Sequence, residues 1–207
     1  MKNLLSGPFK SQLCDAVKNL ERRSQAEIVV LIRAQSGDYR DLAMVWGALG
    51  ALALHSYAIF SPQLLTDQWV YLAPIIGFAL GYLLTSIPLL LRLSVSPKRK
   101  HKQVEIMARA LFQKGGLANT QAKIGILIYF SWLEQCVYVL PDQGAKLAIP
   151  LQAWQILQHN LQRVFQYSHP ELAILEQLQT FEPILAQYLP KRADDFNELP
   201  DDLEITL

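Results

Sequence analysis

Apolar residues fill one continuous stretch of this 207-residue chain, 42–91, in which Asp67 is the only ionised side chain. The stretch divides into two apolar runs, 42–60 and 69–91, joined by a short polar turn at 61–68. A helix needs about 20 residues, each rising about 1.5 Å, to cross a hydrocarbon layer roughly 30 Å thick. Two buried core helices of this kind would need a far larger soluble protein around them. The pattern therefore predicts a transmembrane hairpin.

Positive charge around this hairpin predicts its orientation. Cytoplasmic flanks of membrane helices are enriched in Lys and Arg, whereas short translocated loops are not. The turn between the two runs contains neither residue, while several arginines and lysines lie close to the hairpin on both sides. We therefore expect a two-pass integral membrane protein with both termini in the cytoplasm.

A basic cluster follows the second run and consists of Lys98, Arg99, Lys100 and Lys102. Each cation close to anionic headgroups contributes about 1 kcal/mol to membrane binding. We expect this cluster to contact the membrane surface. The topology accounts for the basic residues without nucleic acid, so the bilayer is the expected partner and no nucleic-acid partner is expected.

The residues outside the hairpin form one predicted domain and a tail. Segments 1–41 and 92–193 together supply enough chain for a single core, so we expect one discontinuous cytosolic domain. The ending, 194–207, is an acidic tail that contains six carboxylates and no cation. Either the tail is solvated, as charged blocks commonly are, or it docks on a basic partner or on the basic cluster of this chain.

Three apolar runs rich in β-branched residues predict strands at 27–32, 124–130 and 136–140. The first run is apolar at nearly every position, which is typical of a strand covered on both faces. A helix predicted at 104–112 separates the first two strands, so these should be parallel. The short turn at 131–135 makes the third strand antiparallel.

Further helices complete the predicted domain. Apolar residues recur at helical spacing over 9–20, and Pro150 and Pro170 each begin another apolar helical stripe. We therefore predict an α/β fold: a small sandwich with a mixed sheet and flanking helices, interrupted by the two-helix transmembrane hairpin.

This topology places candidate residues at two ends of the sheet. Because the first strand leads into the hairpin, the turn that carries Trp132 should face the membrane, where Trp132 contacts the surface or is an ordinary turn aromatic. At the opposite end we expect Glu27, Asn119, Thr120 and Asp142 to meet. Their oxygen atoms would suit Ca²⁺ or Mg²⁺, although capping and turn roles also explain them.

The motifs of common hydrolases and nucleotide-binding enzymes do not occur in the sequence. There is no nucleophile elbow, zinc-protease helix or P-loop. Cys14 and Cys136 lie far apart in the sequence and lack metal-ligand spacing, so a reducing cytosol would keep them as thiols. The sequence motifs therefore give no direct indication of catalysis.

Several segments in the same order resemble one known family. They are the runs at 26–30, 108–112 and 125–129 and the acidic ending at 194–201. Together they resemble the TPM domain family, in its membrane-bound branch with two transmembrane helices inserted in the domain. The resemblance covers essentially the whole chain.

The resemblance implies an α/β sandwich and, for some soluble relatives, divalent-metal binding and phosphatase activity; thylakoid relatives are linked to photosystem repair. Those relatives carry an Asp-Asn-Gly run before the second strand, where this chain has Lys123, Ile124 and Gly125. The positive charge of Lys123 opposes cation binding.

Two functions are compatible with the sequence. The preferred hypothesis is a non-catalytic, membrane-tethered TPM-like interaction or accessory module. It would bind other membrane proteins through its acidic tail or through Gly47, Gly50, Gly77 and Gly81, which permit close helix approach. The alternative is a divalent-metal-dependent phosphatase that uses the predicted metal residues.

Overall fold

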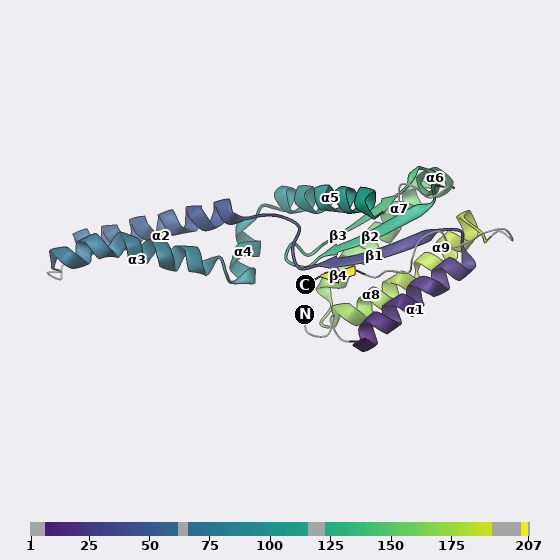
Figure 1. The fold of residues 1–207 in the computed structure, drawn as a ribbon, viewed down its shortest axis with the longest axis horizontal. Helices are drawn as coiled ribbons and strands as arrows, with labels where there is room; N and C mark the ends of the chain where they lie inside the picture. The colour runs from purple at the N-terminus through teal and green to yellow at the C-terminus, as the bar shows by residue number, and fades with distance from the viewer. Residues whose placement is uncertain (1–6, 62–65, 116–122, 192–203, 207) are drawn as a thin grey trace. The chain divides into compact units, whose positions relative to one another are not determined.

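A computed structural model describes residues 7–61, 66–115, 123–191 and 204–206 (Figure 1). The chain forms two compact units. The sheet unit comprises Met1–Ser36 and His101–Leu207, and the hairpin unit comprises Gly37–Lys100. The sheet unit is therefore built from two segments of chain that are separated in sequence by the hairpin unit.

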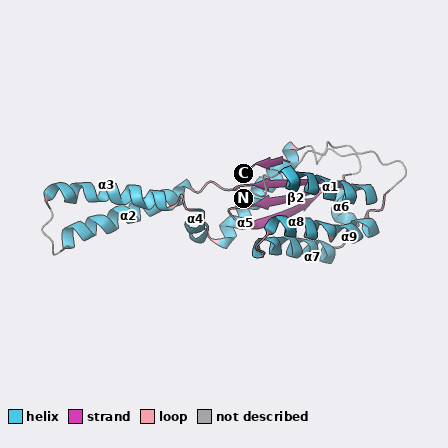
Figure 2. Ribbon diagram, turned by 90° about the horizontal axis from the view of Figure 1, so that it is seen from below, coloured by secondary structure: helices cyan, strands magenta, loops and turns pink. Residues whose placement is uncertain are grey.

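The hairpin unit contains α2 (Arg40–Phe60), α3 (Asp67–Leu84) and α4 (Pro88–Ser94). Helices α2 and α3 lie side by side, and both are long and apolar enough to cross a membrane (Figures 1 and 2). The second predicted run, 69–91, is not one continuous helix. Because proline disfavours a helical conformation in the residue before it, Ile87 is extended and Pro88 begins the separate helix α4.

Glycines allow α2 and α3 to pack backbone against backbone. A Cβ atom added to Gly50 would collide with the carbonyl oxygen of Gly77, and one added to Gly81 would collide with that of Trp46. A Cβ on Gly47 would overlap the ring of Phe78. The sequence suggested that helices of partner proteins would pack against these glycines. In the structure the glycines pack between α2 and α3, so they are no longer evidence for contact with a partner helix.

The sheet has the strand order β3-β2-β1-β4. Strand β1 (Glu27–Arg33) is parallel to β2 (Gly125–Ser131), which is antiparallel to β3 (Cys136–Pro141). The predicted α/β fold and these strand directions are confirmed. Strand β4 (Glu204–Thr206), parallel to β1, was not predicted because three residues are too few to show a periodic pattern. The rest of the acidic tail up to residue 203 lies outside the described residues.

Helices cover both faces of the sheet, so the unit has three layers. Alternate residues of β1 point to opposite faces: Ile28, Val30 and Ile32 join the larger core, and Leu31 joins the smaller one. Every residue of β2 is buried. This burial on both faces is the physical reason why β1 and β2 are apolar at almost every position.

The smaller core forms between the sheet and α5 (Pro97–Lys114), which contributes Val104, Ala108, Leu111 and Phe112. The larger core lies on the opposite face. It includes residues of α1 (Gly7–Arg23), α7 (Leu151–Gln162), α8 (Pro170–Gln179) and α9 (Phe181–Tyr188), and Ala145 of a short helix, α6 (Gln143–Ala148). Together the helices shield the central strands from solvent on both sides.

Short helical pieces connect these elements. Helix α6 (Gln143–Ala148), which was not predicted, follows β3, and the 3-10 turn η3 (Arg163–Gln166) follows α7. As predicted, Pro170 begins a helix, and the chain restarts as α9 two residues before Pro183. A proline is tolerated in the first turn because its missing N–H would have no partner within the helix.

Two glutamines of α7 close the outer edge of β3. Val139 N donates to Gln158 Oε1 (2.9 Å), and Gln158 Nε2 donates to the carbonyl of Val137. Val137 N donates to Gln162 Oε1 (3.0 Å), and Gln162 Nε2 donates to the carbonyl of Gln135 (2.7 Å). Residues four apart on a helix are separated by about 6 Å along the axis, and alternate residues of a strand are separated by about 6.7 Å along the strand. The two spacings are close enough for both glutamines to reach the strand. Each amide therefore takes the place of a neighbouring strand's peptide group.

The glycine contact predicts a sharp difference between two substitutions on α3. Gly81→Leu should destabilise the α2–α3 pair by about 1–3 kcal/mol or more, because the new side chain must displace the backbone of α2. Ala79→Leu is the control, since Ala79 is exposed on the same helix. Denaturant unfolding in detergent micelles, followed by tryptophan fluorescence, measures the difference. Equal midpoints for the two variants would contradict the packing.

Candidate functional site

Two of the four predicted metal residues lie at the same end of the sheet. Glu27 begins β1 and pairs with Gly125 of β2. On the other side of β2, the backbone N–H of Asp142 donates to the carbonyl of Gly125 (2.7 Å). Strands β1 and β3 are two strand spacings apart, or about 9–10 Å. Asn119 and Thr120, the other predicted ligands, lie outside the described residues.

Asp142 has a capping role in this region. It is the N-cap residue of α6, and its Oδ1 accepts a hydrogen bond from Gln143 N (2.7 Å). The carbonyl of Lys123 accepts from Gly144 N (2.8 Å) and Ala145 N (3.3 Å). Asp142 Oδ2 is buried without a hydrogen-bond partner among the described residues. The capping role, one of the two explanations of Asp142 from the sequence, is therefore present.

Within the described ranges, no group of three or more His, Cys, Asp or Glu side chains is placed to hold a metal ion. The predicted ligands Asn119 and Thr120 lie outside these ranges. The predicted metal site stays a prediction.

The opposite end of the sheet contains a buried polar network that the sequence did not reveal. Glu134 Oε1 accepts from Ser36 N (3.0 Å), and Glu134 Oε2 accepts from Ser131 Oγ (2.5 Å). The Ser36 hydroxyl also bonds Ser131 Oγ (2.6 Å) and the Tyr129 hydroxyl (2.8 Å). All four residues are buried, with Glu134 only 4% exposed. A buried carboxylate is tolerated here because hydrogen-bond donors surround it.

This network fixes the point where the chain leaves the sheet. Ser36 is the last residue of the first segment of the sheet unit. The β2–β3 turn adds two backbone bonds, from Trp132 N to Arg33 O (2.9 Å) and from Leu133 N to Ala34 O (2.8 Å). Burial raises the pKa of Tyr129, while its hydrogen bonds with Ser36 and Ser131 oppose the rise. The tyrosine therefore stays a neutral hydroxyl in the network.

Sequence reasoning assigned residues 131–135 to a turn and did not look for a partner. The only local signal is the spacing of Ser131 and Glu134, three residues apart, at which a hydroxyl can reach a carboxylate. Ser36 is 98 residues from Glu134 in the chain. Only the pairing of β1 with β2 brings these two residues together.

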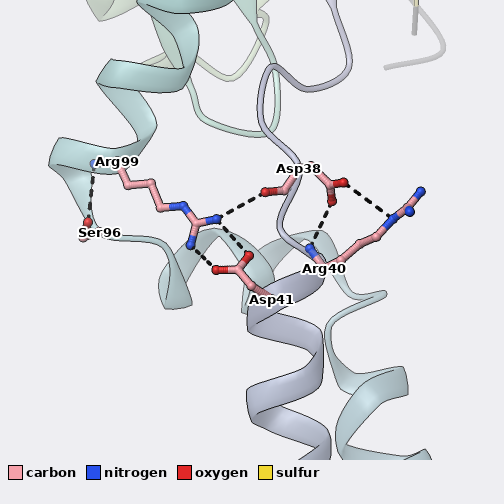
Figure 3. A network of polar contacts seen from close by, with 5 residues as sticks. All are labelled: Asp38, Arg40, Asp41, Ser96 and Arg99. Carbon is pink, nitrogen blue, oxygen red and sulfur yellow. Dashed lines mark hydrogen bonds and ion pairs between the residues drawn. The ribbon is translucent and has the colours of Figure 1, made fainter.

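A second set of polar contacts lies in the hairpin unit and centres on Arg99 (Figure 3). Its guanidinium makes a bidentate pair with Asp41, at 2.6 Å and 2.8 Å, and donates to the Asp38 carbonyl at 3.2 Å. It also lies 5.2 Å from the ring centroid of Tyr39. The bond with Asp41 raises the pKa of Arg99, which therefore stays charged.

These contacts distinguish Arg99 from the other residues predicted to touch the membrane. Arg99, at the start of α5, is joined to the first turn of α2 through its bidentate pair with Asp41, a geometry that lysine cannot reproduce. Lys98 and Lys102 are exposed and Lys100 is half-buried. The lysines are therefore the better candidates for headgroup contact.

Trp132, the fifth predicted surface residue, is half-buried in the β2–β3 turn. It packs against the larger core and meets the ring of Phe165 edge-on, with centroids 5.6 Å apart. This contact is that of an ordinary turn aromatic, the second of the two roles inferred from the sequence. Trp132 follows β2, and its backbone N–H donates to the carbonyl of Arg33 at the carboxyl end of β1. This position agrees with the predicted topology of the sheet.

No protein-family model matches this chain, and no curated protein matches it. Among solved structures it is similar to the NMR structure of the BA42 protein from the psychrophilic bacterium Bizionia argentinensis. The TM-score is 0.61 at 15% sequence identity, over 97% of this chain and 94% of that one. At this identity the likeness concerns the fold alone.

The buried network predicts that Glu134→Ala destabilises the sheet unit by about 2–4 kcal/mol, because the Ser36 N–H and the Ser131 hydroxyl lose their acceptor. Glu176→Ala removes an exposed carboxylate from α8 and is the matched control. Thermal unfolding of the full chain, followed by near-ultraviolet circular dichroism, measures both. A Glu134→Ala protein as stable as the control would show that the network does not hold β1 in place.

Proposed function

We propose that this chain is a two-pass, membrane-tethered accessory module of the TPM type, with its α/β unit and both termini in the cytoplasm. In this role the hairpin anchors the sheet unit close to the bilayer, where it meets other membrane proteins. The observation that carries the proposal is the apolar surface that α2 and α3 turn outward.

Most residues of the two helices are exposed. In the most apolar 18-residue window of each helix, only 17% of the residues are buried. Phe60 is 83% exposed, Tyr71 77% and Leu52 64%. The core helix of a soluble protein would be mostly buried, and soluble proteins rarely expose such large continuous apolar patches. A lipid environment removes the free-energy cost of exposing these apolar side chains to water.

The sheet supports a topology in which the chain returns to the side from which it left. Strands β1 and β2 pair over seven residues, although the hairpin separates them in the sequence. Two membrane crossings satisfy this requirement, while one crossing would divide the sheet between compartments. The Arg99–Asp41 pair likewise joins the first turn of α2 to chain that follows α3. The basic flanks then favour the cytoplasm.

The roles of the residues around the predicted metal site favour an accessory function over catalysis. Asp142 caps α6, and Lys123 places a positive charge at the end of the sheet where the cation would bind. Since the glycines are used between α2 and α3, partner helices would meet the outward apolar faces of the hairpin. The TPM assignment itself rests on the sequence segments and on the α/β fold that they imply.

The topology can be tested by cysteine labelling in sealed cells. A membrane-impermeant maleimide should label Ser61→Cys, at the end of α2, from outside. Lys10→Cys in α1 and Glu176→Cys in α8 are both exposed and should react only after permeabilisation. Cys14→Ser removes the half-buried native thiol from the background. Labelling of Lys10→Cys and Glu176→Cys from opposite sides of the membrane would falsify the proposal.

The partner claim has a separate test that uses α3. A photo-crosslinking amino acid at Tyr71, which is exposed, should capture a second protein in native membranes. The same probe at Ala73, which is 7% exposed, should react only within the chain. If the Tyr71 probe yields lipid adducts and monomer alone, the interaction role is wrong even though the tether stands.

A further inference from the structure

The short apolar helix α4 follows α3 within the hairpin unit. The sequence pattern placed its first residues in the second membrane span, 69–91. In the structure α3 ends at Leu84 after 18 residues, which cover about 27 Å and so nearly the whole of a hydrocarbon layer. The second crossing is therefore complete without α4. In Figure 1 the axis of α4 runs across the direction of α2 and α3 and does not extend α3.

The leucines of α4 form an exposed apolar face. No residue of α4 is buried, and Leu89, Leu90 and Leu93 are 54%, 39% and 73% exposed. Because residues i, i+1 and i+4 project from the same side of a helix, these three leucines share one face. Leu91 and Ser94 project from other sides and are half-buried. The exposed face is continuous along the chain with the apolar surface of α3, so the medium that covers α3 is the natural cover for α4.

A hydrogen bond joins the end of α4 to α2. Trp46 Nε1 donates to Ser94 Oγ at 2.9 Å, and Ser94 Oγ donates to the carbonyl of Leu90 at 2.9 Å. Tryptophan is enriched at membrane–water interfaces, because its ring is apolar and its N–H is polar. In the proposed topology Trp46 lies in the cytoplasmic half of α2. Its bond to Ser94 therefore places α4 at the cytoplasmic interface, and the direction of α4 across the hairpin places it along the membrane plane.

The cations beside the leucine face favour a negatively charged leaflet. Arg92 lies within α4, and Lys98 and Lys100 follow it at the start of α5; none of these three has an acidic partner among the described residues. The carboxylates at the start of the hairpin unit, Asp38 and Asp41, are already paired with other arginines. A helix with an apolar face and neighbouring cations is typical of binding to anionic lipid at a membrane surface.

We propose that α4 is an interfacial helix that lies in the cytoplasmic leaflet and binds anionic phospholipids. Leu89, Leu90 and Leu93 lie among the acyl chains, and Arg92 and Lys98 contact the headgroup phosphates. The proposal deepens the membrane-tether proposal and rests on it, because the hairpin must hold α4 at the bilayer. Binding is reversible and involves no covalent step.

Immersion of α4 can be measured on the full chain in nanodiscs made of phosphatidylcholine and phosphatidylglycerol. A nitroxide at Leu93→Cys, in the Cys14→Ser background, should relax faster with oxygen, which concentrates in lipid, than with a water-soluble nickel complex. The same label at Leu52→Cys on α2 reports whether the hairpin is in lipid. Lys146→Cys, exposed on α6, is the aqueous control. The remaining native thiol, Cys136, is buried.

The two labels separate the two proposals. If the Leu52 label is in lipid while the Leu93 label is reached by nickel, or is shielded from both reagents, α4 is not interfacial and the tether proposal is unaffected. If the Leu52 label is also in water, the tether and the interfacial helix are both wrong. A nitroxide at Leu90→Cys gives a second measurement of α4 should the Leu93 variant fold poorly.

Selectivity for anionic lipid can be measured with spin-labelled phosphatidylglycerol and phosphatidylcholine, from the fraction of each that the protein immobilises. The unmodified chain should prefer phosphatidylglycerol. Arg92→Gln should lower this preference about fivefold, since one cation close to anionic headgroups contributes about 1 kcal/mol. Arg92→Lys keeps the charge and should keep the preference, and Lys146→Gln, at the end of the sheet opposite Ser36, should leave it unchanged. Equal immobilisation of the two lipids, or an unchanged preference in Arg92→Gln, would overturn the proposal.

Discussion

The parallel pairing of β1 with β2 is the constraint on which the remaining structure depends. It joins Glu27–Arg33 to Gly125–Ser131 across the whole inserted hairpin. Because β1 and β2 form the centre of the sheet, both cores pack on this pair. The buried network of Ser36 and Glu134 can form only after it. Any arrangement of the hairpin that keeps these strands apart therefore removes the sheet and the network together.

Each compact unit has its own link between the chain before the hairpin and the chain after it. In the sheet unit, Ser36 is bonded to Glu134, and in the hairpin unit, Asp41 is bonded to Arg99. The two links differ in physical character. The first is buried and depends on complete hydrogen bonding, while the second is partly exposed and depends on the bidentate geometry of arginine. Neither is visible as a local pattern.

The sequence predicted features that follow from local pattern. Burial on both faces forces β1 and β2 to be apolar at almost every position, and the strand order implied that Glu27 and Asp142 would lie at one end of the sheet. The break at Pro88 was missed because counting apolar residues ignores proline geometry. Gln158 and Gln162 look like part of a solvated helix face, and only the neighbouring strand shows their role. Contacts of this kind depend on tertiary register, which no window of sequence contains.

The separation of β1 from β2 has a consequence for biosynthesis. β1 leaves the ribosome about 100 residues before its partner, a delay of roughly 5–20 s at ordinary rates of elongation. During that interval the apolar strand β1 has no strand partner. In the two-pass topology proposed above, the sheet can close only after the second crossing has returned the chain to its starting side. A chain with a different number of crossings would, in that topology, keep β1 and β2 unpaired and exposed to proteases.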